Sequence, residues 1–135
     1  MTAATSDRDS ARREAVNFAY PAKGGVEFFV GAMVAIDTAD SMAKPCTGAA
    51  TQKVVGIAQR RLNTANVADG AQEIQVRRGC YRFANDAAPN NYTAADIGAA
   101  AHALDDSTVS KAEAAAATAG IVRDIDQNGD VWIEI

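Results

Sequence analysis

The sequence predicts an all-β fold, and three features of the chain lead to that prediction. Apolar and polar residues alternate along several short runs, most regularly along residues 72–83. In that run Ile74 and Val76 share one face, and the polar residues between them share the other. Glycine, proline and asparagine punctuate the runs, and a loosely similar pattern of residues occurs twice. A period of two is typical of half-buried strands, so we expect one compact β-domain.

The repeated pattern predicts two related halves. Residues 31–37 recur loosely as residues 98–105, and the pair Gly56-Ile57 recurs as Gly120-Ile121. Each copy closes on a glycine followed by an alternating run, and the second copy is the shorter one. Two copies are too few for a solenoid, which needs about three or more repeats. A duplication of β-units and a chance similarity are both open on the sequence alone.

The N-terminus is predicted to be an extended arm, residues 1–20, ahead of a β-domain at 21–135. Residues 1–14 mix three arginines with three acids and lack an apolar period, so we expect at most one helical turn, at 10–14. Residues 16–20 alternate like a strand and stop at Pro21. We expect this strand to anchor the arm, which would reach a neighbouring protein surface by strand addition; a solubilising tail is the alternative.

The middle of the chain predicts three strand regions. Residues 26–36 are apolar and aromatic, with Gly31 as a turn or bulge, and residues 53–62 resemble a buried strand. Residues 72–83 resemble one long strand in which Gly79 allows a bulge. The polar residues 63–70 are expected to form a loop between the last two regions.

The C-terminal part predicts a loop at 85–91 and a short helical turn near Ala95, where Thr93 to Asp96 resembles a capping box. The alanine-rich residues 112–119 have helical propensity, but the repeat aligns them with a non-helical stretch, so we favour loop and strand. The predicted core consists of Ile74, Val76, Val54, Ile57, Ile121, Phe83 and either Trp132 or its neighbours Val131 and Ile133.

Length and composition indicate one globular domain. A chain of 135 residues can bury about two-thirds of its unfolded surface. Only 6% of the residues are aromatic, so small side chains build the core and partner subunits are expected to complete it. No apolar run reaches the roughly 18 residues that span a membrane, and the N-terminus lacks the pattern of a secretory signal. Cys46 and Cys80 are too few for a disulfide framework, so we expect free thiols.

Charge is distributed unevenly along the chain. The net charge is −4, yet residues 53–83 hold six bases against two acids, and residues 84–135 hold nine acids against two bases. Opposite patches favour contact with a charged neighbour or between copies, although mixed charges also keep a β-surface soluble. Arg60-Arg61 and Arg77-Arg78 could contact nucleic acid, but the isoelectric point of about 4.9 argues against this.

Residues 124–130 resemble the start of a calcium-binding loop. Such a loop requires a bidentate glutamate at its twelfth position, where this chain has Ile135. Asn128-Gly129 between two alternating runs is instead the strongest short signal for a hairpin, typically with a type I′ turn. We expect a hairpin, and a calcium- or carbohydrate-binding β module is the alternative function.

The residue patterns do not predict catalysis. His102 is the only histidine, and the chain shows no spacing that supplies it with a nucleophile or with metal ligands. The phosphate-binding loop and the G-x-S-x-G and H-E-x-x-H motifs are absent. We expect a protein that is not an enzyme, binds no cofactor or metal, and uses His102 structurally.

From residue 29 to residue 135 the order of motifs is similar to that of the head decoration, or structural cement, proteins of tailed phages. The motifs are V-G-A-x-V-x-x-D at 30–37, V-G-I-A at 55–58, G-x-x-x-I-x-V-x-x-G at 70–79, I-G-A at 97–99, G-I-V at 120–122 and I-x-I at 133–135. They specify residue types and not a catalytic signature. The alanine tract at 112–119 is longer than the resemblance to this family leads us to expect.

This resemblance implies a β-barrel-like or tulip-like domain, often a trimer, whose N-terminal arm reaches onto the capsid lattice. The expected function is to bind the outer surface of the capsid and to stabilise it by bridging capsomers. The expected partners are the phage major capsid protein and further copies of this chain, without nucleic acid or membrane. The expected location is the exterior of the virion, after assembly in the bacterial cytoplasm. Residues expected at the capsid or subunit interface are Arg8, Arg12, Arg13, Phe18, Tyr20, Arg60 and Arg61.

Overall fold

Short strands dominate the computed structural model, which describes residues 3, 5–7 and 9–135. The all-β prediction is confirmed: apart from one turn of 3₁₀ helix, every element in the described chain is a strand. In chain order the elements are β1 (Asn17–Pro21), β2 (Glu27–Phe28), β3 (Met33–Asp37), β4 (Met42–Pro45), β5 (Gln52–Ala58), β6 (Leu62–Asn63), β7 (Glu73–Arg77), β8 (Cys80–Asn85), η1 (Ala94–Asp96), β9 (Ala100–Ala103), β10 (Thr108–Val109), β11 (Ala117–Ile125) and β12 (Val131–Glu134).

The strands of the two halves pair in the same way. In the first half β3 pairs with β4 and β5, β5 with β7, and β7 with β1. In the second half β9 pairs with β10 and β11, β11 with β12, and β12 with β8. Each circuit closes by a short parallel contact, between Ala22 and Ala43 in the first half and between β8 and β10 in the second. The repeat in the sequence therefore corresponds to a repeat in strand order and pairing.

A pair of glycines extends this correspondence to the backbone. Gly56 of β5 and Gly120 of β11 have φ angles of 155° and 149°, and each lies beside a register shift in its ladder. A Cβ atom on Gly56 would lie 2.7 Å from the carbonyl oxygen of Arg77, and one on Gly120 would collide with that of Glu134. Only glycine permits so close an approach of a neighbouring strand. In each half, a glycine at the equivalent position thus allows the long strand to bend.

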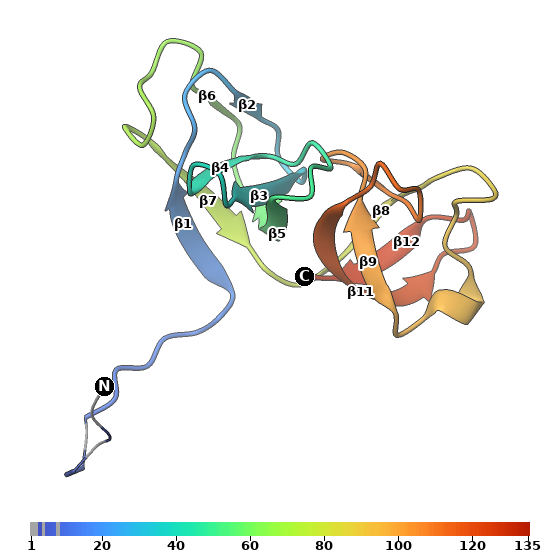
Figure 1. Cartoon of the computed structure of the whole chain (residues 1–135), viewed down its shortest axis with the longest axis horizontal. Coiled ribbons are helices and arrows are strands. Elements are labelled where there is room, and N and C mark those ends of the chain that lie inside the picture. Colours follow the sequence, from blue (N-terminus) through green and yellow to red (C-terminus); the bar gives the residue numbers. More distant parts are fainter. Residues whose placement is uncertain (1–2, 4, 8) are drawn as a thin grey trace.

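Two hydrophobic cores fill the halves, and β3 contributes to both. The first core includes Val34 and Ile74, whereas the second includes Val122, Ile133 and also Met33. Successive side chains of a strand point to opposite faces, so neighbouring residues of β3 enter different cores. Figure 1 shows the blue-to-green strands of the first half beside the orange-to-red strands of the second. The two halves are therefore joined by the packing of β3 side chains in both cores as well as by the covalent chain.

The predicted core is confirmed in most positions. Ile74, Val76, Phe83, Val131 and Ile133 are buried. Val54, Ile57 and Ile121 are half-buried. Trp132 is half-buried on the outward face of β12, so the core uses the alternate face of this strand.

Several boundaries differ from the prediction. Residues 72–83 form two strands, β7 and β8, because the chain passes from one half to the other at Arg78 and Gly79. Residues 53–62 likewise divide between β5 and β6, and residues 10–14 contain no helical turn. The predicted loop at 85–91 is confirmed from residue 86, since Asn85 ends β8, and the 3₁₀ turn after Thr93 and the loop-then-strand structure of residues 112–119 are also confirmed. Because β1 belongs to the first circuit, the described part of the arm ends at Val16.

Candidate interaction surface

Strand β1 leaves one of its two edges open. Its ladder to β7 uses the main-chain groups of even-numbered residues, as the bonds at both ends show: Arg78 N–H donates to Val16 O and Ala22 N–H to Gln72 O, each at 2.8 Å. The odd-numbered residues point their main-chain groups to the other side. There Lys23 N–H donates to Ala43 O at 2.8 Å, but the second edge of Asn17–Pro21 pairs with no strand of the described chain. An open edge of this kind is a template for strand addition.

An apolar groove of about 520 Å³ lies beside this edge, between the two halves. Phe18 and Tyr20 of β1 line it together with Val55, Ile121 and Ile135. The rings of Phe18 and Tyr20 stack with their centroids 6.0 Å apart. On one side these rings pack against the first core, and on the other they border the groove, so both stay half-buried.

The groove also carries positive charge. Lys53 and Arg78 belong to its lining, and neither forms an ion pair with an acid among the described residues. A partner that offers carboxylates and an extended backbone would therefore match both the charge and the open edge.

The arm extends away from both halves, as Figure 1 shows. Every described residue before Val16 is exposed. The Arg13 guanidinium lies over the ring of Phe18 at 4.7 Å, close enough for a cation–π contact. The structure thus brings together three of the predicted interface residues, Arg13, Phe18 and Tyr20. Arg12 is exposed in the arm, and Arg8 lies outside the described residues.

The other two predicted residues lie apart from each other, Arg61 beside β2 and Arg60 beside β7. Arg61 pairs with Glu27 at 2.7 Å, and its guanidinium lies 5.0 Å from the ring centre of Phe29. Arg60 donates to the main-chain oxygen of Glu73 at 3.2 Å. The groove does not include either arginine. The assignment of the seven residues to a capsid or subunit interface therefore stays a prediction.

Sequence reasoning missed two exposed apolar side chains at equivalent places in the two halves. Val30 is 68% exposed and Ile97 is 48% exposed. Val30 directly precedes the Gly-Ala pair that leads into β3, and Ile97 directly precedes the Gly-Ala pair that leads into β9. The V-G-A and I-G-A motifs were the available signal, but motifs alone do not reveal exposure.

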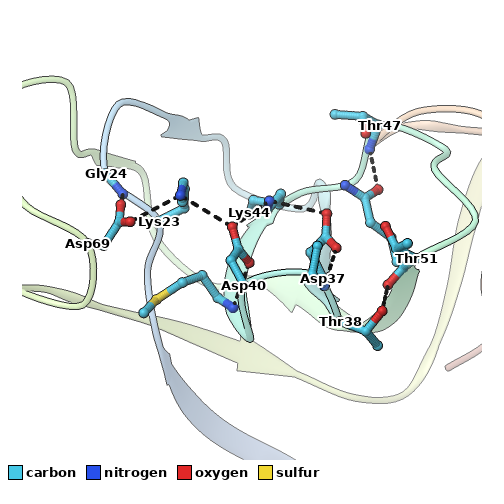
Figure 2. A network of polar contacts seen from close by, with 12 residues as sticks. Lys23, Gly24, Asp37, Thr38, Asp40, Lys44, Thr47, Thr51 and Asp69 are labelled. Carbon is cyan, nitrogen blue, oxygen red and sulfur yellow. Dashed lines mark hydrogen bonds and ion pairs between the residues drawn. The ribbon is translucent and has the colours of Figure 1, made fainter.

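A network of charged side chains, shown in Figure 2, ties three loops of the first half together. Lys23 contacts Asp69 at 3.0 Å and Asp40 at 3.3 Å, while Lys44 contacts Asp40 at 3.0 Å and Asp37 at 3.2 Å. The main-chain N–H of Met42 and the ammonium of Lys44 lower the pKa of Asp40 to about 2. The carboxylates also accept main-chain N–H groups, so the network serves to hold loops and leaves little capacity for a ligand.

Residues 126–130 connect β11 and β12 as a hairpin loop, as predicted, but not with a type I′ turn. Asp126 N–H donates to Asp130 O at 2.7 Å and Gly129 N–H to Asp126 O at 2.9 Å. Gly129 has a φ of 92°, whereas Asn128 does not have a positive φ, so this is a three-residue loop with glycine in the left-handed position. Arg82 contacts Asp126 at 2.9 Å and Asp130 at 3.7 Å. This arginine occupies the acids that a calcium ion would need, so the geometry does not favour the calcium-binding alternative.

The remaining reactive side chains have structural surroundings. Cys46 and Cys80 are free thiols, and burial raises the pKa of the Cys46 thiol. His102 is half-buried in β9, where its main-chain N–H donates to the Tyr92 hydroxyl at 2.9 Å. Within the described residues, no three histidine, cysteine or acidic side chains gather as a metal site would require.

The described part of the chain also contains no helix with the length and hydropathy needed to cross a bilayer. Comparison with known proteins gave no match to a family model, a curated protein or a solved structure.

Proposed function

We propose that this protein is a non-enzymatic structural protein of a tailed-phage virion, which binds the outer surface of the capsid and bridges neighbouring capsomers. The observation that carries the proposal is a long exposed arm on a folded body whose first strand is open beside an apolar, positively charged groove. One chain thereby has two separate contact surfaces and can link one neighbour to the next, as bridging of capsomers requires.

Contact area alone can perform this function. A specific interface buries about 800 Å² on each partner. When such contacts repeat over a shell, each further contact is made at high effective concentration, so individually modest contacts hold firmly. A net charge of −4 helps to keep free copies soluble. The order of motifs that resembles head decoration proteins supports a capsid as the surface.

The proposed partners are the phage major capsid protein and further copies of this chain, with a trimer as the favoured assembly. Oligomers with closed symmetry are the usual solution for one small repeated subunit. The proposed location is the exterior of the virion. The function proposed involves neither nucleic acid nor membrane.

The test is decoration of purified capsids. Capsids of the phage that encodes the chain are mixed with the pure protein, and bound copies are counted by sedimentation and located by electron microscopy. We expect saturable binding to the outer surface, and weaker binding after deletion of residues 1–14 with an unchanged melting temperature. If the full chain does not bind these capsids, the proposed function is wrong; if the truncated chain binds equally well, the arm is only a tail.

A further inference from the structure

We propose that the groove receives the arm of a second copy of this chain, so that copies join head to tail. This inference rests on the homo-oligomer of the proposed function and names the contact that would build it. It is tested without capsids, so its failure can be separated from a failure of capsid binding.

The open edge of β1 supplies the main-chain half of this contact. Asn17 and Ala19 each offer an N–H and a C=O group, and Pro21 offers only a C=O. A strand added along Asn17–Pro21 would satisfy these groups and cover the exposed sides of Phe18 and Tyr20. Main-chain hydrogen bonds would supply affinity, and the groove would select the side chains.

The arm has the composition that this site requires. Among its three arginines it carries three acids, Asp7, Asp9 and Glu14, and the groove holds Lys53 and Arg78 without acidic partners among the described residues. Charge-assisted contacts between carboxylates and such bases are the stronger class of polar contact. The arm also contains alanine residues, and part of the groove wall is likewise formed by small residues, Ala100, Ala119 and Gly120.

A second copy fits better than the same copy. The described arm bends at Ala15 and Val16, where Arg13 lies over the Phe18 ring, and the residues before this bend point away from both halves, so they would have to reverse direction to reach their own groove. Fourteen extended residues reach about 45 Å, at roughly 3.3 Å each. That is about three times the radius of gyration expected for a domain of this length, roughly 14 Å. The arm is therefore long enough to reach a neighbour.

The internal repeat points to the same site. Met33 pairs with Ile57 in the first half as Ala100 pairs with Ile121 in the second, so Met33 and Ala100 are equivalent. Met33 is fully buried under the second half, whereas Ala100 is exposed and lines the groove. The second half thus leaves uncovered a position that protein covers in the first half.

Because the arm and the groove are different surfaces, the contact is heterologous and can close into a ring such as a trimer.

The test uses the full chain and two variants, measured by analytical ultracentrifugation. We expect the full chain to form an oligomer, and we expect both the deletion of residues 1–14 and the double variant Lys53→Glu/Arg78→Glu to weaken self-association by roughly tenfold or more. Arg77→Glu is the matched control, because Arg77 is also exposed and forms no ion pair with another described residue, but does not line the groove. All variants should keep the circular dichroism of the parent.

A mixing experiment separates this contact from other ways of associating. The deletion variant has a groove but no arm, and the charge-reversed variant has an arm but an impaired groove. Mixed together, they should form a one-to-one dimer and stop there, and Asp7→Lys/Asp9→Lys in the arm should restore assembly of the charge-reversed chain. The inference is overturned if the full chain is monomeric, if both variants assemble like the parent, or if no mixed dimer forms. Capsid binding that requires the groove but not the arm would also overturn it, and would assign the groove to the capsid protein.

Discussion

Gly56 and Gly120 show how one residue type sets the shape of each half. Each glycine stands where a neighbouring main-chain carbonyl leaves no room for a Cβ atom. The long strand can therefore pass from one partner to the next within its circuit, β5 from β3 to β7 and β11 from β9 to β12. The glycine is required by the close approach itself as well as by the φ angle.

We expect Gly120→Ala to lower the free energy of unfolding by about 3 kcal/mol or more, since it adds a collision with Glu134 to backbone strain of about 1–3 kcal/mol. Gly98→Ala is the control. Gly98 also has a positive φ, of 92°, but nothing lies within 4 Å of its Cβ position, so the cost should be only about 1–2 kcal/mol. Urea denaturation of both variants measures the difference. Equal losses would show that the approach of β12 does not matter.

The charged network gives a prediction about acid stability. The pKa of Asp40 in the folded protein is about 2, below its ordinary value of 3.8. A lowered pKa means that the carboxylate stabilises the fold fully above pH 3.8 and loses this effect as the pH falls towards 2.

We therefore expect Asp40→Asn to melt below the parent at pH 5, with the gap narrowing as the pH approaches 2. Asparagine keeps an acceptor for Met42 N–H but not the charge that faces Lys23 and Lys44. Asp9→Asn, in the exposed arm, should leave the melting temperature unchanged. A gap that stays constant from pH 5 to pH 2 would contradict this account.

At this scale the sequence predicted apolar positions better than polar contacts. Ile74 and Val76 could be assigned to the core because alternation reports directly on which face is buried. The contact between Lys23 and Asp69 joins loops 46 residues apart in the chain. This contact depends on where the strand circuit of the first half closes, so no pattern of neighbouring residues in the sequence predicts it.

Among the elements, the β11–β12 hairpin shows what a local signal can specify. Asn-Gly correctly marks the turn, but the type I′ turn assumes a two-residue loop. Here the bond between Asp126 and Asp130 places three residues in the loop, and only Gly129 takes a positive φ. The length of a loop depends on the register of its strands, which the dipeptide does not determine.

Gly129→Val should destabilise the protein by about 2 kcal/mol, because a β-branched residue resists a positive φ. Gly129→Asn should cost less, since asparagine tolerates the left-handed region. Adding calcium should shift the melting temperature of the parent little, because Arg82 already contacts both Asp126 and Asp130. A clear rise with calcium would restore the metal-binding interpretation of this loop.

The division of residues 72–83 into two strands has a different cause. Alternation continues on both sides of the break, so the pattern predicts a single strand. The break is a property of the duplication, because β7 ends the first circuit and β8 begins the second. Periodicity indicates which side chains of a strand are buried, but it does not indicate the half to which the strand belongs. The receiving groove was missed for a related reason, since its walls come from β1, β5, β9 and β11.

On the scale of the whole molecule, the halves repeat one another but depend on shared packing. Met33 and Ala35 come from the first half and are fully buried in the second core. We expect a chain of residues 80–135 alone to lack a cooperative thermal transition, because removal of these side chains opens its core. Residues 15–135 should melt cooperatively, close to the parent temperature. A cooperative transition in the shorter chain would show that the second half is an independent domain.

The position of Trp132 makes this dependence visible by optical spectroscopy. It is the only tryptophan of the chain, and it lies half-buried on β12. Its fluorescence therefore reports on the second half, whereas far-ultraviolet circular dichroism reports on the strands of both. If β3 couples the two cores, the two signals will change at the same denaturant concentration. The native protein, without substitution or label, can thus reveal whether the duplicated chain unfolds in one transition or in two.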